Sequence, residues 1–278
     1  MTSATSSIGA VGRNGLHTVF GRSLHAHARA LTWWAVGMVS MLAMMLAIYP
    51  AIRDNPEAQD YVESMPEALR ELFGTADITS GPGYLQGELF SIMVPLLMVI
   101  MAVLWGSDEV AGEEERGTLD LVLATPVSRG RVFTEQLASV LAGVVGLGAL
   151  VFVTIAVGSL AVELDVGYGN LASVVTATTV LTMLYGTIAA SLGAATGQRA
   201  LARGVATALA VVAYLVSVLA PLAGVLEVIR PLSPWWHALG VGPLETGWHP
   251  VRLLGLLTVA VLAAIAGARA LDRRDLAV

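Results

Sequence analysis

The chain has 278 residues, of which 56% are hydrophobic and only 13% are charged, and its formal net charge is -6. A soluble globular domain has roughly 25% charged residues, so this composition excludes an ordinary soluble protein and indicates a membrane-embedded one. All 15 basic residues are arginine and cysteine is absent, which excludes a P-loop, whose lysine reaches the nucleotide phosphates, and any thiolate chemistry.

Residues 1–30 are expected to form a cytoplasmic amino terminus with an amphipathic helix. Leu16, Val19, Phe20 and Leu24 recur at helical spacing among arginines and histidines, a pattern typical of a helix that lies on the membrane surface before the first span. The segment has no apolar core followed by a small-residue cleavage site, so we expect it to be retained rather than removed as a signal peptide.

Six stretches are long and apolar enough to cross the roughly 30 Å hydrocarbon core of a membrane. They are 31–49, 89–105, 137–160, 171–196, 205–225 and 253–268. The second and sixth are short, and we expect each to extend by a few residues. The sequence therefore predicts an all-α membrane protein, with a six-span transmembrane domain over residues 31–278.

The arginines indicate how these spans are oriented. With a cytoplasmic amino terminus, 11 of the 15 arginines fall in inner segments and 4 in outer ones, which agrees with the positive-inside rule. We therefore expect both termini to be cytoplasmic. All six tryptophans lie near predicted span ends, where an amphipathic ring is most stable at the membrane interface.

The segment 50–85 is expected to be extracellular and to contain a short interfacial helix. Pro66 is suited to a first helical turn and Gly74 to a helix end, with Leu69 and Phe73 on one face between them. Packing on the outer ends of the spans is the favoured role of this helix, and a lid over an outer exit is the alternative.

The inner segment 107–133 combines a charged run with an apolar turn. Acidic residues come first, an apolar helical turn over 119–123 follows, and Thr125 and Pro126 end it. A short helix with exposed apolar side chains is suited to docking into a cleft on another protein. The alternative is a loop that its charges merely solvate, but this does not explain apolar side chains outside any span.

The fourth predicted span carries a polar stripe that includes Thr176, Thr179, Thr182 and Tyr185. These side chains could line a cargo path, although hydrogen bonding between spans is the more common use of threonine in membranes. No ionisable residue lies deep inside a predicted span, which disfavours a proton-coupled antiporter or an ion channel. The pattern is compatible with export of hydrophobic or amphipathic small molecules.

The segment 226–250 is expected to be extracellular and to form short outer or re-entrant helices. It contains prolines and tryptophans but no apolar run of about 20 residues. Because proline interrupts a helix, breaks are predicted at Pro231 and Pro243.

The chain resembles the coupling region of ABC-2 type transporter permeases in the run GEEERGTLDLVLATPVSRGRV, residues 112–132. It is also similar to the multidrug and polyketide-antibiotic export branch of that family in the runs LTWWAVGM, MPEALRELFG, GYLQGELF and LSPWWHALGVGPLETG. The resemblance extends from about Arg22 to the carboxyl terminus. It implies six spans per subunit, two such domains per transporter, and a separate pair of nucleotide-binding subunits that hydrolyse ATP.

The resemblance also implies that the 107–133 segment contacts the ATPase subunit. Four charged residues would dock, a glycine would turn the chain, and a cytoplasmic coupling helix would insert into the partner. The residues expected to take part are Glu113, Glu114, Glu115, Arg116, Gly117, Thr118, Leu119, Leu121, Leu123, Pro126 and Arg129.

The expected function is that of the permease subunit of an ATP-binding cassette exporter, multi-pass in the cell (plasma) membrane. We do not expect an enzyme, a cofactor or a metal on this chain, because ATP and Mg would bind the partner subunit. The expected partners are that ATPase, a second copy or a related permease, and membrane lipid, with no nucleic acid. The alternatives are a secondary transporter or channel not powered by ATP, and an intramembrane metalloprotease, which is disfavoured because all five histidines lie outside the predicted spans.

Overall fold

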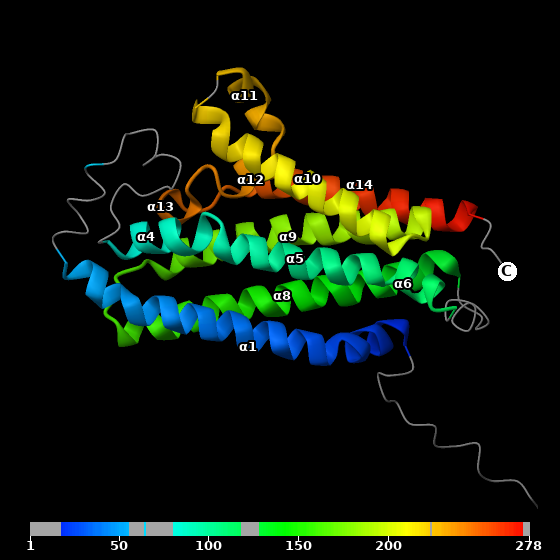
Figure 1. Cartoon of the computed structure of the whole chain (residues 1–278), viewed down its shortest axis with the longest axis horizontal. Coiled ribbons are helices and arrows are strands. Elements are labelled where there is room, and N and C mark those ends of the chain that lie inside the picture. Colours follow the sequence, from blue (N-terminus) through cyan, green and yellow to red (C-terminus); the bar gives the residue numbers. More distant parts are fainter. Residues whose placement is uncertain (1–17, 56–63, 65–79, 118–127, 223, 275–278) are drawn as a thin grey trace, which may run out of the picture.

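The computed structural model describes residues 18–55, 64, 80–117, 128–222 and 224–274. Six helical segments of this described part are long and apolar enough to cross a membrane, and they form a bundle (Figure 1). They are α1 (Val19–Arg53), Gly81–Asp108, α8 (Arg129–Ala161), α9 (Tyr168–Thr196), Arg199–Leu222 and α14 (Pro250–Arg273). The predicted all-α membrane fold with six spans is confirmed, and so is the greater length of the second and sixth spans.

The first span is one uninterrupted helix of 35 residues. Thr18 caps its start, because the Thr18 hydroxyl accepts a hydrogen bond from the backbone N–H of Gly21 at 3.0 Å. No proline occurs before Pro50, in the last turn, so nothing breaks the backbone ladder between the amphipathic segment and the span. Residues 19–30 are helical, as predicted, and continue directly into the span. That this part of the helix lies on the membrane surface stays a prediction.

The second span changes its helical geometry along its length. A first turn, α4 (Gly81–Tyr84), leads into a π-helical turn, η2 (Leu85–Phe90), and the regular helix α5 (Met93–Asp108) follows. The backbone N–H of Ser91 bonds to the carbonyl of Gln86 at 2.9 Å, which is the i→i+5 spacing of a π turn. Pro95 lacks the N–H that would bond back to Ser91, so the helix is free to deviate there.

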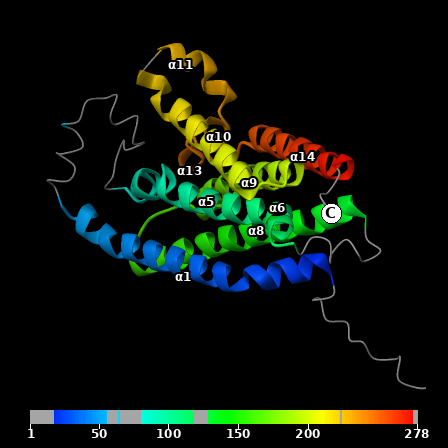
Figure 2. The same cartoon turned by 45° about the vertical axis from the view of Figure 1, so that its right-hand side comes forward.

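Helix α9 forms the centre of the bundle. It packs against α5, α8, α14 and α10 (Arg199–Leu219), and it is the most buried of the six spans. Gly106 of α5 lies against the backbone of Gly186 and Ala190 in α9, so small residues allow these two helices to approach closely. α1 instead contacts mainly α8, at the opposite edge of the bundle from α14 (Figure 2).

Short helical elements fill the segment between the fifth and sixth spans. They are the 3-10 turn η3 (Ala220–Leu222), α11 (Gly224–Ile229), the 3-10 turn η4 (Arg230–Leu232), α12 (Pro234–Ala238) and α13 (Pro243–Thr246). α11 stands on the end of α10, whereas α12 and α13 pack against α9 (Figure 1). Pro231 lies in η4 and Pro243 is the first residue of α13, so both predicted breaks are confirmed.

The connecting segments are shorter than predicted. α1 continues to Arg53 and α4 begins at Gly81, inside the segment 50–85. α8 begins at Arg129, inside the segment 107–133, because Ser128 caps it and its carbonyl accepts the first helical hydrogen bond, from Val132. The predicted interfacial helix over 66–74 and the predicted coupling helix over 118–123 lie outside the described residues.

Candidate functional site

A charged junction occupies the end of the bundle where α1 begins and α14 ends. Its centre is α6 (Val110–Glu115), a short helix that follows α5 after a sharp backbone turn at Glu109, where ψ is -95°. Val110, Ala111 and Gly112 are buried against the bundle, which directs the glutamates that follow toward the surrounding helix ends. We call α6, with Asp108, Glu109 and the side chains that contact their carboxylates, the α6 junction.

Each glutamate of α6 contacts a different part of the bundle. Glu113 accepts a hydrogen bond from the Gln136 side chain of α8 at 2.8 Å and lies 3.7 Å from the Arg22 guanidinium of α1. Glu114 forms an ion pair with Arg274, which directly follows α14. The α6 junction therefore joins the first, third and sixth spans.

Glu115 and Asp108 extend these contacts to the fifth span. The Glu115 carboxylate lies 3.3 Å from the Arg199 guanidinium and accepts the Arg199 backbone N–H at 2.9 Å, at the start of α10. Asp108, at the end of α5, accepts from Arg199 at 2.8 Å and from Arg116 at 3.2 Å. Ion pairs that are exposed to solvent contribute little to the stability of a fold, so the main effect of these pairs is to fix the relative positions of the helix ends.

The predicted docking residues thus have partners inside the chain. Glu113, Glu114, Glu115 and Arg116 all form contacts with other elements of the bundle, and their docking to another protein stays a prediction. Gly117 has φ of +67°, the left-handed conformation expected of a turn glycine.

The remaining predicted coupling residues divide into two groups. Arg129, the first residue of α8, donates a hydrogen bond to the backbone carbonyl of Arg274 at 2.7 Å, so it too contacts the end of the sixth span. The others lie outside the described residues and are Thr118, Leu119, Leu121, Leu123 and Pro126.

Glu109 is the least exposed carboxylate of the junction, at 3% exposure. It accepts hydrogen bonds from Ser23 of α1 and from the Trp105 indole at 2.6 Å, and the Ser139 hydroxyl of α8 lies 3.4 Å away. Burial raises the pKa of Glu109 from 4.5 to about 7, although the hydrogen bond from Ser23 and nearby His27 oppose the shift. The carboxyl group therefore keeps its proton to a higher pH than an exposed glutamate does.

His27 and Trp105 complete this buried cluster. Their rings stack with centroids 4.7 Å apart, and His27 nitrogens lie 3.8 Å from Asp108 and 3.9 Å from Glu109. Burial also raises the pKa of Glu113, the next acid along α6. Within the described part of the chain, no three histidine, aspartate or glutamate side chains are arranged to hold a metal ion.

Sequence reasoning missed Asp108 and Glu109 as members of the site. Trp105 was predicted to lie at the membrane interface, but it is 4% exposed and bonds to Glu109 one helical turn later. Trp235 is also buried, at 4% exposure. The sequence signals for the cluster are the four-residue spacings of Trp105 and Glu109 and of Ser23 and His27, each on one helical face, but these two pairs are far apart in the chain.

The polar stripe of α9 makes its hydrogen bonds mainly within the helix. Thr179 and Thr182 donate to the carbonyls of Val175 and Thr178, four residues earlier, at 2.7 and 2.8 Å. Thr176 is half-buried and Tyr185 is 1% exposed. The expected bonds between spans are therefore not made by Thr179 and Thr182, and a cargo path along these residues stays a prediction.

The sequence was also compared with known protein families. A family model described as "Multidrug efflux system permease Rv1217c, C-terminal domain" matches residues 16–271. No match was found among curated proteins. The matched range contains α1, α6 and the short helices before the sixth span, so it includes most of the α6 junction.

Proposed function

The chain belongs to the family of this multidrug efflux permease domain, among the ABC-2 type transporter permeases, and from this premise we propose that it is the membrane subunit of an ATP-driven exporter. In this proposal a separate subunit binds ATP and Mg and hydrolyses the nucleotide. The permease pairs with a second copy or a related chain, and the cargo is a hydrophobic or amphipathic small molecule. The complete absence of lysine supports a separate ATPase, since this chain has no P-loop lysine.

The observation that carries the proposal is the distribution of the contacts of α6. Its three glutamates reach residues of α1, α8, α10 and the end of α14. A partner that displaces the 107–129 segment would therefore change the positions of several spans at once. Coupling needs packed elements with alternative arrangements, and ion pairs between helix ends can exchange at little cost.

Coupling can be tested in the complex with the ATPase subunit, co-expressed and reconstituted in liposomes. We expect Leu121→Asp to lower ATP-driven transport at least tenfold, because a charge would enter an apolar docking helix, and Glu114→Gln to lower it several-fold by breaking the pair with Arg274. Asp272→Asn is the matched control, since Asp272 is an exposed acid near the end of α14, at the same end of the bundle.

Two results would contradict this coupling proposal. One is wild-type transport in both the Leu121→Asp and Glu114→Gln complexes. The other is transport that continues after ATP depletion and follows an ion gradient, which would support a secondary transporter instead. Purified chain without its partner should show no ATPase activity.

The orientation can be tested because the chain has no cysteine of its own. We propose that both termini and the α6 junction are cytoplasmic, which follows the arginine distribution. Single cysteines at Thr118 and at the exposed Asp165, between α8 and α9, should then react with a membrane-impermeant maleimide from opposite sides of intact cells. Asp165→Cys should label before permeabilisation and Thr118→Cys only afterwards, and labelling of both from one side would overturn the topology.

A further inference from the structure

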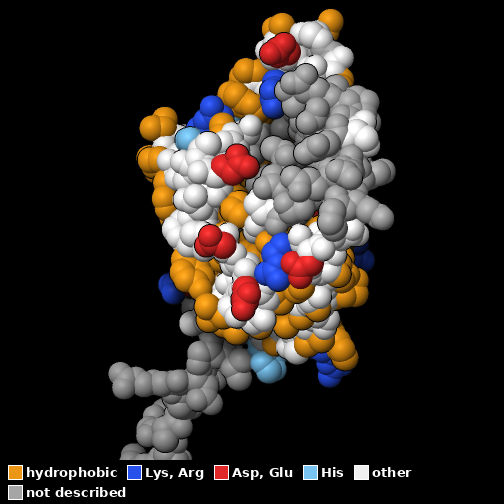
Figure 3. Space-filling view, turned by 90° about the vertical axis from the view of Figure 1, so that its left-hand side faces the viewer, with side chains coloured by type: hydrophobic (Ala, Val, Ile, Leu, Met, Phe, Trp, Pro, Cys, Tyr) orange, Lys and Arg blue, Asp and Glu red, His pale blue; other side chains and the backbone are white. Residues whose placement is uncertain are grey.

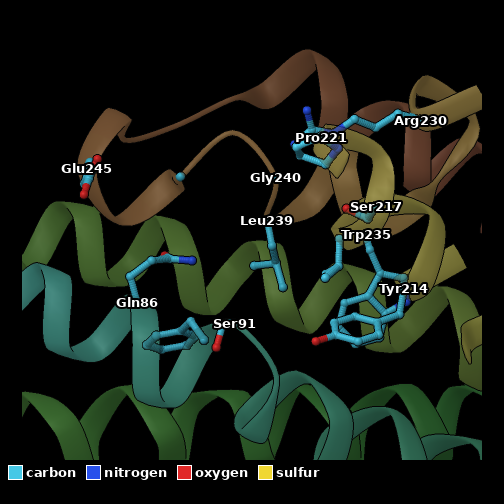
Figure 4. A pocket seen from close by; sticks show the side chains of 13 residues that line it. Gln86, Ser91, Tyr214, Ser217, Pro221, Arg230, Trp235, Leu239, Gly240 and Glu245 are labelled. Atoms are coloured by element: carbon cyan, nitrogen blue, oxygen red, sulfur yellow. The ribbon is translucent and has the colours of Figure 1, made fainter. Parts of the chain in front are cut away.

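A cavity of about 230 Å³, whose lining is drawn in Figure 4, lies among elements on the opposite side of the bundle from α6, as Figure 1 shows. It is partly open and lies between the π turn η2, the far end of α10 and the chain from η4 to α13. Phe90, Tyr214 and Leu239 give it an apolar wall. Figure 3 shows the end of the molecule nearest to it, where acidic and basic side chains lie among apolar ones.

Three polar groups that line this cavity have buried atoms without a hydrogen bond to any described residue. They are the side-chain oxygen of Gln86, Nε of Arg230 and the indole N–H of Trp235. Each comes from a different element, η2, η4 and α12 respectively. A buried polar atom without a partner is costly, so their convergence on one cavity indicates an occupant that bonds to them.

Local structure holds these groups in place. The Trp235 ring packs edge-on against Tyr214, with centroids 5.1 Å apart, and Trp235 is 4% exposed. The Trp235 N–H interacts with the Tyr185 hydroxyl of α9 at more than hydrogen-bond distance, so an occupant would compete with Tyr185 for this donor. The π turn places Gln86 on the cavity side of the second span (Figure 4), and such turns occur frequently at functional sites.

The lining defines the chemistry of the occupant. Arg230 supplies a cation and an N–H donor, Trp235 supplies a second donor, and Gln86 an amide. An apolar cleft of about 60 Å³ lies between α5 and α10 and shares the lining residues Tyr214 and Trp235 with the cavity. Glu245 lies on the other side of the cavity from Arg230 (Figure 4), so a negatively charged group is favoured near Arg230 and opposed near Glu245.

We propose that this cavity binds the acidic headgroup of an amphipathic molecule, a carboxylate or a phosphate ester, whose apolar part lies in the cleft between α5 and α10. The claim that such a molecule is the cargo rests on the proposed export function. The claim that the cavity binds it does not, because binding can be measured on the full chain without ATP or the ATPase subunit.

The test uses the full chain in nanodiscs of phosphatidylcholine and four radiolabelled probes with the same alkyl chain. These are dodecanoate, dodecyl phosphate, dodecanol and dodecyltrimethylammonium. We expect saturable binding of the two anionic probes at least tenfold tighter than that of the cationic probe. Tighter binding of the cation, or equal binding of all four probes, would overturn the proposal and leave a cavity that holds water only.

Variants locate the site. Arg230→Gln should weaken anion binding about tenfold or more, and Trp235→Phe, which keeps the ring and removes the N–H, about three- to tenfold. Glu245→Gln should leave binding unchanged or tighten it, because it removes a negative charge near the cavity. An equal loss of dodecanoate binding in Arg252→Gln would instead indicate general charge attraction.

Arg252 is the matched control because it lies 4.2 Å over the Trp236 ring, near the start of α14, and does not line the cavity. Thermal unfolding of each variant separates loss of the site from loss of the fold. Displacement of dodecyl phosphate by phosphatidylglycerol in the nanodisc identifies a lipid headgroup as the ligand, and no displacement identifies a free amphiphile. Both results support the site.

The two proposals can fail separately. Intact anion binding in a complex that does not transport dodecanoate with ATP would leave the site valid and contradict its role in export. The opposite result is also possible. The complex could export another cargo with ATP, show no loss of that export in Arg230→Gln and Trp235→Phe, and bind no anionic probe. This would support the exporter and contradict the binding site.

Discussion

Replacing Gly106 by alanine should prevent α5 and α9 from packing at their present separation. A Cβ atom at Gly106 would collide with the backbone carbonyl oxygen of Gly186 and lie 3.2 Å from the backbone nitrogen of Ala190. A backbone cannot turn away as a side chain can, so the helices must separate along the most buried face of the bundle. Overpacking of this kind costs typically about 1–3 kcal/mol and sometimes more. We expect a large fall in the yield and unfolding temperature of detergent-purified protein.

Two other glycines provide the control for this substitution. Gly37 of α1 and Gly146 of α8 are also inside spans, but an added Cβ would meet no atom within 4 Å at either position. Alanine favours a helix over glycine by about 0.5–1 kcal/mol, so Gly37→Ala and Gly146→Ala should be neutral or slightly stabilising. If Gly106→Ala unfolds at the same temperature as these two variants, the close contact between α5 and α9 is wrong.

Glu109→Gln should keep the fold and reduce its dependence on pH. The folded protein holds the Glu109 proton more tightly than the unfolded chain, because the pKa rises from 4.5 to about 7. The resulting stabilisation is complete below about pH 4.5 and is lost as pH rises through about 7, and it is on the order of 3 kcal/mol. The wild-type unfolding temperature should therefore fall between pH 5.5 and 8 by more than that of Glu109→Gln.

Other charged groups that face Glu109 also influence how the unfolding temperature depends on pH. They are His27 of α1, Asp108 of α5 and Glu113 of α6. Asp272→Asn is the control, since Asp272 is an exposed acid at the same end of the bundle. If wild type and Glu109→Gln lose stability in parallel from pH 5.5 to 8, Glu109 is not the group that titrates there.

Glu109→Ala should be much more damaging than Glu109→Gln. A glutamine oxygen can still accept from Trp105 and Ser23, whereas alanine leaves these donors without their acceptor. Ser23 can bond instead to Ser139, whose hydroxyl oxygen is 2.6 Å away, so the main loss falls on the buried Trp105 N–H. A donor left without a partner costs about 1–3 kcal/mol. Equal unfolding temperatures for the two variants at pH 6 would contradict the described hydrogen bonds.

Features that depend on neighbouring residues could be predicted from the sequence. Apolar runs identified the six spans because crossing hydrocarbon requires continuous apolar length, and Pro231 and Pro243 marked helix breaks because proline has no N–H to donate. The end of α1 and the start of α8 were placed less well, since a helix can continue through polar residues once its backbone hydrogen bonds are formed.

The buried cluster around Glu109 could not be predicted in the same way. Its acceptor and the Ser23 donor are 86 residues apart, and Ser23 and Ser139 are 116 apart. Only the packing of α1 and α8 beside α5 brings these groups together. The cavity near Trp235 could not be predicted for the same reason, because its lining residues Gln86 and Arg230 come from distant parts of the chain.

The unbroken α1 helix has a mechanical consequence. Its 35 residues span about 52 Å at 1.5 Å per residue, well beyond the roughly 30 Å of hydrocarbon. One end contacts α6 through Arg22 and Ser23, and at the other end Arg53 donates to the Val162 carbonyl, directly after α8. If α1 tilted as one unit about its middle, its two ends would move in opposite directions, so a displacement at the α6 junction would reach the opposite end of the bundle within one helix.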